Sequence, residues 1–392
     1  MHKHFDVIVI GVGAMGAATC FHLAKRGVKV LGLEQFDIVH ARGSSHGYSR
    51  MIRKAYFEHP NYVPLLHRAY ALWEALEEES GRKLLHKVGG IFLGPRERTL
   101  VGGALAAAEL HGLPHELLAA EELRKRWPQF VVPDDWHGFY EPDSGFLLPE
   151  RAIGTYADMA MRRGSEIHGQ EAACEWRADR GPAGVHYVVT TDAGTYAAGR
   201  LVFCGGPWSG KLLADLQEFG GITLKVTRQV MAWAWPKVPQ DFELGRIPVW
   251  GIDSMDGGLY YGFPMHGEMP GVKFAHHLPT GAAVDPDAVS REVTAAERAG
   301  VKGILGRFLP GADGELLAIK TCLYTNSPDG HFIIDAHPAH TGVLVACGFS
   351  GHGFKFASVI GEMLADACVT GRMNGEAAFL GLARFAPGRA PG

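Results

Sequence analysis

The first 34 residues hold the feature that most constrains how this chain can fold. Val7 to Ile10 are a continuous β-branched run, which is typical of a strand buried on both faces. Three glycines follow in the spacing G-x-G-x-x-G, namely Gly11, Gly13 and Gly16. A helical apolar pattern then continues to Gly27, and Val28 to Leu33 predict a second strand that ends at Glu34. The segment predicts a parallel βαβ unit with an acid at its end.

Each part of this unit has a physical role in a dinucleotide-binding site. Gly11 makes the tight turn, Gly13 lets the backbone approach a pyrophosphate, and Gly16 lets the helix pack closely on the strand. The helix N-terminus offers free N–H groups to the phosphates. Glu34 can accept hydrogen bonds from ribose hydroxyls and lies near the usual distance of about 20 residues further on. The alternative is a βαβ turn without a ligand, and the motif alone does not separate FAD enzymes from NAD enzymes.

Composition narrows the class of protein. The chain has 392 residues, enough for two domains, and its net charge of −4 gives no basic surface for nucleic acid. No apolar run reaches the roughly 18 residues that a membrane-spanning helix needs. The six cysteines are widely spaced without a C-x-x-C pair, which argues against a disulfide framework and against a metal site. Because the first strand begins almost at once, we expect no cleaved signal peptide and a cytoplasmic protein.

A polar segment rich in Gly and Ser, from His40 to Tyr56, follows the second predicted strand. Its basic residues are Arg42, His46, Arg50, Arg53 and Lys54. Ligands of parallel sheets bind at the carboxyl ends of the strands. We therefore interpret the segment as a loop that closes over an anionic cofactor or substrate, and the alternative is a solvated loop.

The remaining chain alternates between helical and strand patterns. Helices are predicted at 62–79, 96–111, 120–127 and 151–163, within 285–307, and at 356–369. Strands are predicted at 90–94, 186–191, 195–197, 200–204, 223–235, 249–263 with a turn at 256–258, 272–275, 318–325, 331–335 and 342–346. The stretch 131–150 is rich in Pro, Asp and Gly, and we expect it to connect two domains.

Two more predicted strands end in glycine turns. The strand 200–204 runs into Gly205-Gly206-Pro207-Trp208, a second candidate contact for phosphate or flavin. The strand that ends at Ala346 runs into a third turn and then the last helix; the glycines of that turn are Gly348, Gly351 and Gly353. That helix would point its N-terminus at the pyrimidine carbonyl of a flavin, where negative charge collects on reduction, and Lys355 adds a full positive charge. A closing turn of this kind favours FAD over NAD.

With these residues in place, the chain resembles the monomeric sarcosine oxidase family, which includes N-methyltryptophan oxidase. The matching stretches are FDVIVIGVGAMGAA, GSSHGYSRMIRKAY, RWPQFVVPDDW with EPDSGFL, LYYGFP, TCLYTNSPDGHFIID and GFSGHGFKFASVIGE. They run nearly from end to end, and the last two are long and specific.

We predict an α/β fold in two domains. A Rossmann-like FAD-binding domain of the glutathione reductase type would comprise residues 1–85, 148–222 and 321–392. Residues 86–147 and 223–320 would form a substrate domain whose mostly antiparallel sheet covers the pocket. The resemblance further implies a monomer, and FAD bound covalently through a thioether from Cys322 to the flavin's 8-methyl group. Taken alone, Cys322 would be a small buried residue.

The resemblance also implies the chemistry and the site. A secondary N-methyl amino acid is oxidised to an imine, electrons pass to oxygen to give hydrogen peroxide, and water hydrolyses the imine to formaldehyde and the amino acid. The implied catalytic residues are Lys273, Arg50, His46 and His277. The implied substrate-binding residues are Arg53, Lys355, Tyr261, Tyr324 and Gly351. The implied cofactor-binding residues are Gly11, Gly13, Gly16, Glu34, Ser44, Cys322, Gly348, Gly351, Gly353 and Lys355.

The implied roles agree with elementary electrostatics. Arg53 and Lys355 would grip the substrate carboxylate, since arginine offers a planar fork for a bidentate contact. Lys273 would lie near the flavin nitrogen that accepts hydride, where a fixed cation stabilises reduced oxygen species. A secondary amine with a pKa of roughly 10 costs about 4 kcal/mol to neutralise at pH 7, and a cationic pocket lowers that cost. Without the resemblance, Lys273 would be interpreted as a solvated residue on a strand face.

The other implied positions would shape the pocket. Tyr261 and Tyr324 would orient the substrate and His277 would tune the charge near its carboxylate, while Trp208 would pack against the cofactor. Two departures from the family pattern concern the flavin face: Ser45 stands where a second histidine is frequent, and Ser49 where threonine is common. Two tryptophans are expected to face the substrate, namely Trp233 and Trp235.

Three alternatives stay open. A glycine oxidase or D-amino acid dehydrogenase would share the fold but hold FAD non-covalently, and a quinone-dependent dehydrogenase would need neither Cys322 nor Lys273. A cyclic imino acid, such as pipecolate or proline, would be a substrate of a different shape. A flavin-binding subunit without turnover would not need the cations Arg53 and Lys355. The expected partners are therefore an amino acid and O2.

Overall fold

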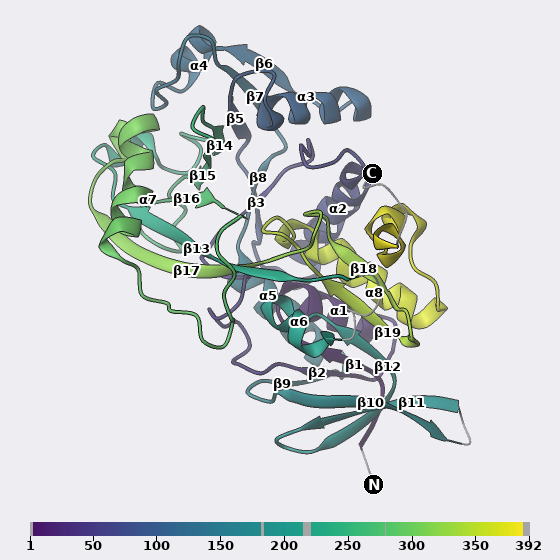
Figure 1. The fold of residues 1–392 in the computed structure, drawn as a ribbon. Helices are drawn as coiled ribbons and strands as arrows, with labels where there is room; N and C mark the ends of the chain where they lie inside the picture. Colours follow the sequence, from purple (N-terminus) through teal and green to yellow (C-terminus); the bar gives the residue numbers. More distant parts are fainter. Residues whose placement is uncertain (1–2, 182–183, 215–220, 279, 387–392) are drawn as a thin grey trace.

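Two large sheets form the frame of the computed structural model, which describes residues 3–181, 184–214, 221–278 and 280–386 (Figure 1). One eight-stranded sheet is mainly parallel, and the other eight-stranded sheet, here the roof sheet, is mostly antiparallel. The chain passes repeatedly from one to the other, so that each sheet is built from separate segments. The predicted α/β class is confirmed.

The parallel sheet is organised around β1 (Lys3–Ile10), the strand that precedes the first glycine motif. β1 lies between β2 (Val30–Leu33) and β12 (Thr195–Phe203), with parallel pairing on both sides. β9 (Glu166–His168) pairs with β2, and β19 (His340–Cys347) pairs with β12, again in parallel. The antiparallel strands of this sheet are β10 (Ala173–Gly181), β11 (Gly184–Thr191) and β18 (Ile333–His337). The last four residues of β1 are buried, as its β-branched run predicts.

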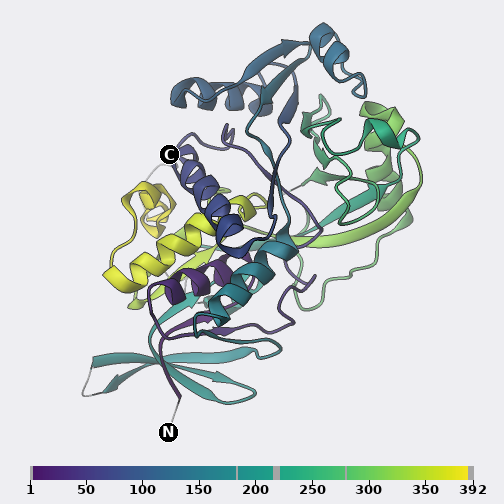
Figure 2. The ribbon, with the colours of Figure 1, turned by 180° about the vertical axis from the view of Figure 1, so that it is seen from behind.

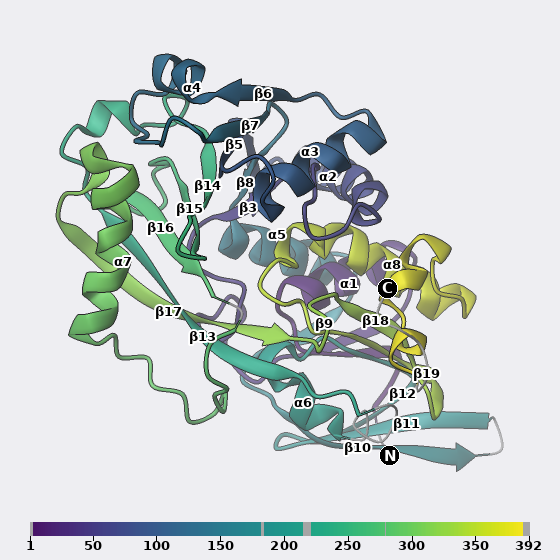
Figure 3. The same cartoon turned by 45° about the horizontal axis from the view of Figure 1, so that its top comes forward.

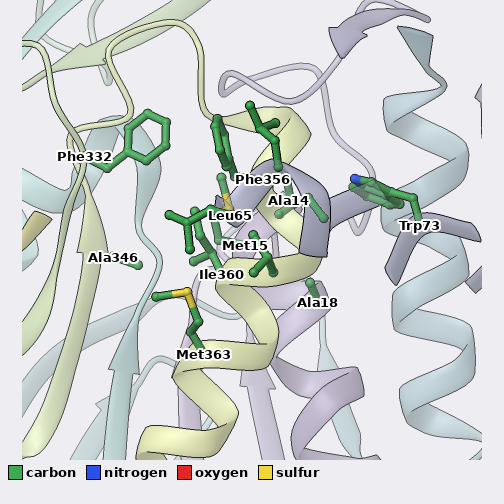
Figure 4. Close-up of a cluster of buried hydrophobic side chains, with 14 of the residues drawn as sticks. Ala14, Met15, Ala18, Leu65, Trp73, Phe332, Ala346, Phe356, Ile360 and Met363 are labelled. Carbon is green, nitrogen blue, oxygen red and sulfur yellow. The ribbon is translucent and has the colours of Figure 1, made fainter. Parts of the chain in front are cut away.

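Three helices pack on one face of the parallel sheet, namely α1 (Ala14–Lys25), α5 (Pro149–Met161) and α8 (Ala357–Thr370) (Figure 2). A fourth, α2 (Tyr62–Ser80), packs against α8. A Cβ added at Gly361 would lie 2.6 Å from the Cβ of Ala18, so glycine allows α8 to approach α1 closely. Met15, Ala18 and Ile360 meet in this contact (Figure 4). Truncating a side chain such as Ile360 to alanine would cost about 2–5 kcal/mol of stability.

The roof sheet has the strand order β17-β13-β16-β15-β14-β5-β7-β6. Its strands are β5 (Gly90–Gly94), β6 (Glu116–Ala119), β7 (His137–Glu141), β13 (Lys225–Ala234), β14 (Val249–Asp253), β15 (Leu259–Phe263), β16 (Val272–His277) and β17 (Leu316–Asn326). All neighbours pair antiparallel except β14 and β5, which are parallel. The expected mostly antiparallel sheet is therefore present.

The two faces of the roof sheet have different partners (Figure 3). On one face, α7 (Ala295–Phe308) buries Ile304 and Leu305 against Trp250 and Phe274. On the other face, Leu100 and Ala104 of α3 (Thr99–His111) pack with Phe92 and Phe139. The second face is turned towards the parallel sheet. Because successive side chains of a strand point to opposite faces, every second residue of each roof strand lies on this face.

A small three-stranded sheet lies between the parallel sheet and the roof sheet. Its strands are β3 (Arg50–Ile52), β4 (Leu85–Lys87) and β8 (Gly145–Leu147). β8 occupies the centre, and a Cβ at Gly145 would fall 1.9 Å from the carbonyl oxygen of His86. The stretch 131–150 is therefore not a plain connection, because it contains both β7 and β8.

Other differences concern lengths and boundaries. The predicted strands 195–197 and 200–204 are one strand, β12, whose first half pairs with β11 and whose second half pairs with β19. The region 285–307 contains one α-helix, α7, whose N-cap Thr294 forms a capping box with Glu297. The turn that contains Trp208 leads into a helix of only four residues, α6 (Ser209–Leu212). The domain boundaries stay a prediction, and their residues 1–2, 215–220 and 387–392 lie outside the described part.

Candidate active site

A cavity of about 470 Å³ lies between the carboxyl ends of the parallel strands and the roof sheet. The predicted site residues that line it are Gly11, Gly13, Glu34, Ser44, Arg50, Arg53, Tyr261, His277, Cys322, Tyr324, Gly351, Gly353 and Lys355. Trp208 lines it as well. The predicted site residues that do not line it are Gly16, His46, Lys273 and Gly348. Residues that lie more than 300 positions apart in the chain thus share one cavity, as a ligand at the ends of parallel strands requires.

The first glycine turn forms one end of the cavity with its backbone. Gly11 has φ +89°, and a Cβ there would lie 2.5 Å from the carbonyl oxygen of Cys204. A Cβ on Gly16 would lie 1.8 Å from the carbonyl oxygen of Gly11, so helix α1 can pack only with glycine there. No described atom lies within 4 Å of a Cβ added at Gly13. Gly11 and Gly16 therefore shape the turn, while Gly13 keeps open the space in which a ligand can approach the backbone.

Glu34 is buried at the end of β2 and faces the same end of the cavity. Its Oε2 accepts a 2.9 Å hydrogen bond from the amide of Val12, and its Oε1 accepts one from the amide of Phe36. Burial raises the pKa of the Glu34 carboxyl, although these amides counteract the effect. The Nε2 atom of His40 lies 3.5 Å from the Oε1 atom of Glu34. The carboxylate is held rigidly where ribose hydroxyls are expected.

The second and third glycine turns close the cavity from the other strands. Gly205, Gly206 and Trp208 follow β12 and line it. In the third turn, Gly351 has φ +81°, and a Cβ there would lie 2.5 Å from the ring of Tyr324. Only glycine lets this turn contact the roof sheet so closely. Gly348, with φ +64°, shapes the same turn without reaching the cavity.

These residues fit a flavin dinucleotide. The backbone cradle at Gly13, the fixed carboxylate of Glu34 and the third turn before α8 together supply the phosphate, ribose and flavin contacts expected of FAD. Both ring nitrogens of His46 are buried and have no hydrogen-bond partner among the described residues. Burial, and then the charge of Arg50, keeps the pKa of His46 well below its usual value, so the ring is neutral.

Strand register explains why five predicted residues meet on the roof. Tyr261 of β15, Lys273 and His277 of β16, and Cys322 and Tyr324 of β17 all lie on the sheet face turned towards the parallel sheet. The Nδ1 atom of His277 and the hydroxyl of Tyr324 are 3.1 Å apart. Burial lowers the pKa of His277 to about 4 and raises the pKa of Tyr324 well above its usual value. Both side chains are therefore neutral at pH 7 and available as hydrogen-bonding groups.

Lys273 lies behind the cavity wall. Its side chain is fully buried, and its Nζ donates hydrogen bonds of 2.7 Å and 2.6 Å to the carbonyl oxygens of Gly47 and Ser49. The ammonium also lies 4.9 Å from the ring centroid of Phe263. Burial first, and then Arg50, holds the pKa of Lys273 well below its usual value. The lysine thus fixes the loop that carries Arg50, and it is not the solvated residue that its strand pattern alone predicts.

Arg53 and Lys355 form a compact charged cluster with Glu58. The Nη2 atom of Arg53 donates to both carboxylate oxygens of Glu58, at 2.8 Å and 2.7 Å. The Nζ of Lys355 donates to the carbonyl oxygen of His352 at 2.7 Å and lies 5.0 Å from the ring centroid of Tyr56. All three charged groups line the cavity. Two cations against one carboxylate leave room for one further anion.

The pKa values of this cluster follow from burial and from charge. Burial alone would raise the pKa of Glu58, but Arg53, His352 and Lys355 bring it down to about 2. Burial, followed by repulsion from Arg53, lowers the pKa of Lys355 to about 7, against an opposing effect of Glu58. Glu58 therefore stays ionised at pH 7, whereas Lys355 changes its charge near neutral pH.

Cys322 is buried, with 2% of its surface exposed, and lines the cavity next to the loop that contains Ser44. The hydroxyl of Ser44 donates to the carbonyl oxygen of Leu323, which ties that loop to β17 beside Cys322. Burial raises the pKa of the Cys322 thiol, while Arg50 and Lys273 oppose the rise. All six cysteines are free, as their spacing predicts.

The cavity also contains residues that were not predicted from the sequence, namely Phe57, Glu58, Phe92, Leu100, Gly251, Leu259 and His352. The sequence feature that could have indicated Glu58 is its position, because it is an acidic residue directly after the basic segment 40–56. Conversely, neither of the tryptophans expected to face the substrate lines the cavity. Trp233 is fully buried beside Lys273, and Trp235 is 47% exposed beyond the end of β13.

Comparison with known proteins places this geometry in a family. The model of the family described as "FAD dependent oxidoreductase" matches residues 6–367. The chain belongs to this family. It is 41% identical over 374 residues to the monomeric sarcosine oxidase of Streptomyces avermitilis, with 95% of each chain covered. It is 36% identical to the N-methyl-L-tryptophan oxidase of Yersinia pestis, over 92% of this chain and 94% of the other. These relatives confirm the resemblance drawn from the motifs.

Among solved structures, the chain is similar to NikD, an unusual amino acid oxidase essential for nikkomycin biosynthesis. The TM-score is 0.82 at 25% identity, and the match covers 97% of each chain. The protein is thus an FAD-dependent oxidoreductase. Among the described residues, no group of three or more His, Cys, Asp or Glu side chains could hold a metal ion. No helix in the described part is long and apolar enough to cross a bilayer.

Proposed function

We propose that this enzyme oxidises the secondary amine of N-methyl amino acids with O2 as the electron acceptor. The observation that carries the proposal is the pair of cations, Arg53 and Lys355, that faces the cavity beside the third glycine turn. One anion is needed to balance the cluster that they form with Glu58. An amino acid carries such an anion next to its amine, and the relatives named above act on N-methylated amino acids by name.

The chain's own residues would bind and orient the substrate. The carboxylate would take the guanidinium fork of Arg53 and the ammonium of Lys355, and binding would favour the charged form of that lysine. The same positive charge would favour the neutral amine, which is the form that can be oxidised. The hydroxyls of Tyr261 and Tyr324 would orient the amine, with Tyr324 held by neutral His277.

FAD, when bound, supplies the acceptor for the hydride and passes the electrons to O2. The products would be an imine and hydrogen peroxide, and water would hydrolyse the imine to formaldehyde and the demethylated amino acid. Arg50 would keep the reacting end of the cavity positive, which stabilises negative charge that develops on oxygen, and Lys273 would hold the loop that carries Arg50. No described residue has to act as a dedicated base, because the positive pocket itself disfavours the ammonium form.

The finer features follow from the same site. We propose that Cys322 attaches FAD covalently, because its thiol faces the cavity beside two cations that favour the thiolate. We also propose a monomeric, cytoplasmic enzyme, in which free thiols persist. Analytical ultracentrifugation and cell fractionation would test these two features.

A peroxide assay tests the reaction. Purified protein would be mixed with sarcosine, N-methylalanine, N-methyltryptophan, glycine, proline and pipecolate, and peroxide and formaldehyde would be measured. N-methyl substrates should yield equal amounts of both products. Activity with glycine or with the cyclic imino acids alone would contradict the proposal, and so would activity that requires a quinone.

A denaturing gel tests the covalent link. Flavin fluorescence should migrate with the wild-type band after an acid wash and disappear in Cys322→Ala. Cys347→Ala is a matched control, because Cys347 is equally buried and free but does not line the cavity. Fluorescence that washes off the wild type would show that Cys322 is an ordinary buried thiol.

A further inference from the structure

Part of the cavity wall beside Arg53 is apolar, and we call the space along this wall the apolar lobe. The lobe is lined by Phe57, Phe92, Leu100, Gly251 and Leu259. The guanidinium carbon of Arg53 lies 4.3 Å from the ring centroid of Phe57 and 5.7 Å from that of Phe92. Arg53 therefore lies against this apolar wall, and a carboxylate bound by Arg53 would lie close to it.

Gly251 occupies a position where a strand would ordinarily carry a side chain. It lies in the interior of β14, directly opposite Phe92 on β5 and Tyr261 on β15. Residues in register on neighbouring strands point to the same face, so a side chain at 251 would point into the cavity. Glycine weakens a strand interior, and its presence there often marks a close approach by a ligand.

The atoms around Gly251 show how much space a side chain at this position would have. Gly251 is not among the residues with positive φ, so its backbone does not require glycine. A Cβ there would lie 3.0 Å from Cδ1 of Phe92 and 3.5 Å from Cδ2 of Leu100. The contact with Phe92 is tighter than an ordinary van der Waals contact, so a side chain at 251 would have to displace that ring or take up space in the lobe. The backbone of β14 thus forms the floor of the lobe.

The lobe is also chemically selective. Its five lining residues carry no charge and no hydrogen-bonding side chain, and Phe92 and Leu100 are at most 2% exposed. A sarcosine molecule has no side chain on its α-carbon and would leave this wall without a partner. An apolar substituent on the substrate would remove the apolar wall from water, and each methylene buried in this way would improve binding roughly fourfold.

We propose that this lobe binds a large apolar or aromatic side chain on the substrate's α-carbon, and that Gly251 is the residue that sets the depth of the lobe. The inference rests on the proposed oxidation of N-methyl amino acids and names the substrate class within it. N-methyl derivatives of phenylalanine, leucine or tryptophan are then better substrates than sarcosine.

The test compares two substrates on the holoenzyme and on variants of the lobe. We would measure kcat/KM for N-methylphenylalanine and for sarcosine, and take their ratio. The ratio should exceed one in the wild type and fall by about tenfold or more in Gly251→Leu, as is usual when an apolar pocket is filled. Leu100→Phe fills the lobe from α3 and should lower the ratio even if Gly251→Leu does not fold. Ile252→Leu is the matched control, because Ile252 is buried on the opposite face of the same strand.

A binding measurement separates this inference from the proposed function. Acetate and phenylpropionate would be titrated into the holoenzyme, and the change in its visible flavin spectrum would report binding without turnover. Phenylpropionate should bind more tightly than acetate, and Gly251→Leu should remove the difference. Equal affinity for the two acids, or an unchanged substrate ratio in both lobe variants, would overturn the inference while leaving the oxidase intact. Tight phenylpropionate binding without oxidation of any N-methyl amino acid would support the lobe and overturn the proposed function.

Discussion

The two ends of the cavity recognise their ligands by different means. At the dinucleotide end, recognition is mostly backbone: Gly11 and Gly13 shape the wall, and one carboxylate, Glu34, is fixed by amides. At the substrate end, recognition is by side chains, and the buried charges of Arg53, Glu58 and Lys355 dominate. The first end lies in one continuous βαβ unit, whereas the second is assembled from the loop after β3, from the roof strands and from the third turn.

This difference determines how each end responds to substitution. Where the main chain itself forms the contact surface, no side chain can move aside. An added methyl group therefore displaces the main chain or the ligand. Removing one member of a cluster of buried charges leaves its partner without a counter-charge, which costs stability as well as the balance of charge. Changes at the first end should therefore reduce cofactor binding, and changes at the second end should reduce substrate binding at some cost in stability but with FAD retained.

The largest effect is expected at Gly16. In Gly16→Ala the new Cβ would collide with the carbonyl oxygen of Gly11, now 1.8 Å away, and α1 would have to move off β1. We expect a loss of about 3 kcal/mol in the free energy of unfolding, measured on the apoprotein, and little bound flavin. Gly13→Ala is the control, since no described atom lies within 4 Å of its new Cβ. It should keep the apoprotein's stability while binding less FAD, and equal stability of the two variants would break the comparison.

The next effect is expected at Arg53. Arg53→Met removes the fork and leaves the half-buried Glu58 carboxylate without its ion-pair partner, where it repels the substrate carboxylate. We expect kcat/KM for N-methyl amino acids to fall about 100-fold, equivalent to roughly 3 kcal/mol, with flavin content unchanged. Arg53→Lys keeps the charge but not the fork and should lose less. Loss of flavin together with substrate binding would show that the two ends are not separate.

A pH titration sharpens the comparison further. The pKa of Lys355 is lowered to about 7, so the free enzyme carries this positive charge below that pH and loses it above. The dissociation constant of acetate should therefore rise as the pH increases through about 7, by up to roughly tenfold per unit. Acetate is used because it has no amine of its own to titrate. In Lys355→Met the acetate dissociation constant should depend much less on pH. An unchanged pH profile would mean that another group causes the pH dependence.

The smallest effect is expected at Glu58. Its carboxylate has a pKa of about 2 and competes with the substrate for the guanidinium of Arg53. Glu58→Gln keeps the shape but removes the competing charge, so acetate should bind about fivefold more tightly, a gain of roughly 1 kcal/mol. Isothermal titration would measure this gain. Weaker binding would mean that Glu58 holds Arg53 in place more than it competes for it.

The dinucleotide end could be predicted from the sequence because its determinants are contiguous. The strand, the three glycines and Glu34 follow one another, and each acts through local backbone geometry. The residues of the roof could be predicted only through the family resemblance, because strand register brings Tyr261 next to His277 and Tyr324. Nothing in the local pattern of β16 distinguishes buried Lys273 from a solvated lysine.

The residues that escaped prediction depend on tertiary contacts. Glu58 becomes a partner of Arg53 only when the loop folds back on itself, and Gly251 matters only because β5 and β15 place Phe92 and Tyr261 beside it. β7 and β8 were missed in 131–150 because their short runs are interrupted by Pro and Gly and gain their pairing from distant strands. Conversely, Trp233 points at the buried ammonium of Lys273 and not at the cavity.

The most direct test of the account mixes the purified holoenzyme with an N-methyl amino acid in the absence of oxygen. We predict that the visible absorbance of the bound flavin bleaches, and that admitting O2 restores it with an equimolar yield of hydrogen peroxide and formaldehyde. Arg53→Met should bleach far more slowly at the same flavin content. A flavin that stays oxidised with every N-methyl amino acid, or that bleaches but is not reoxidised by O2, would contradict the assignment as an N-methyl amino acid oxidase.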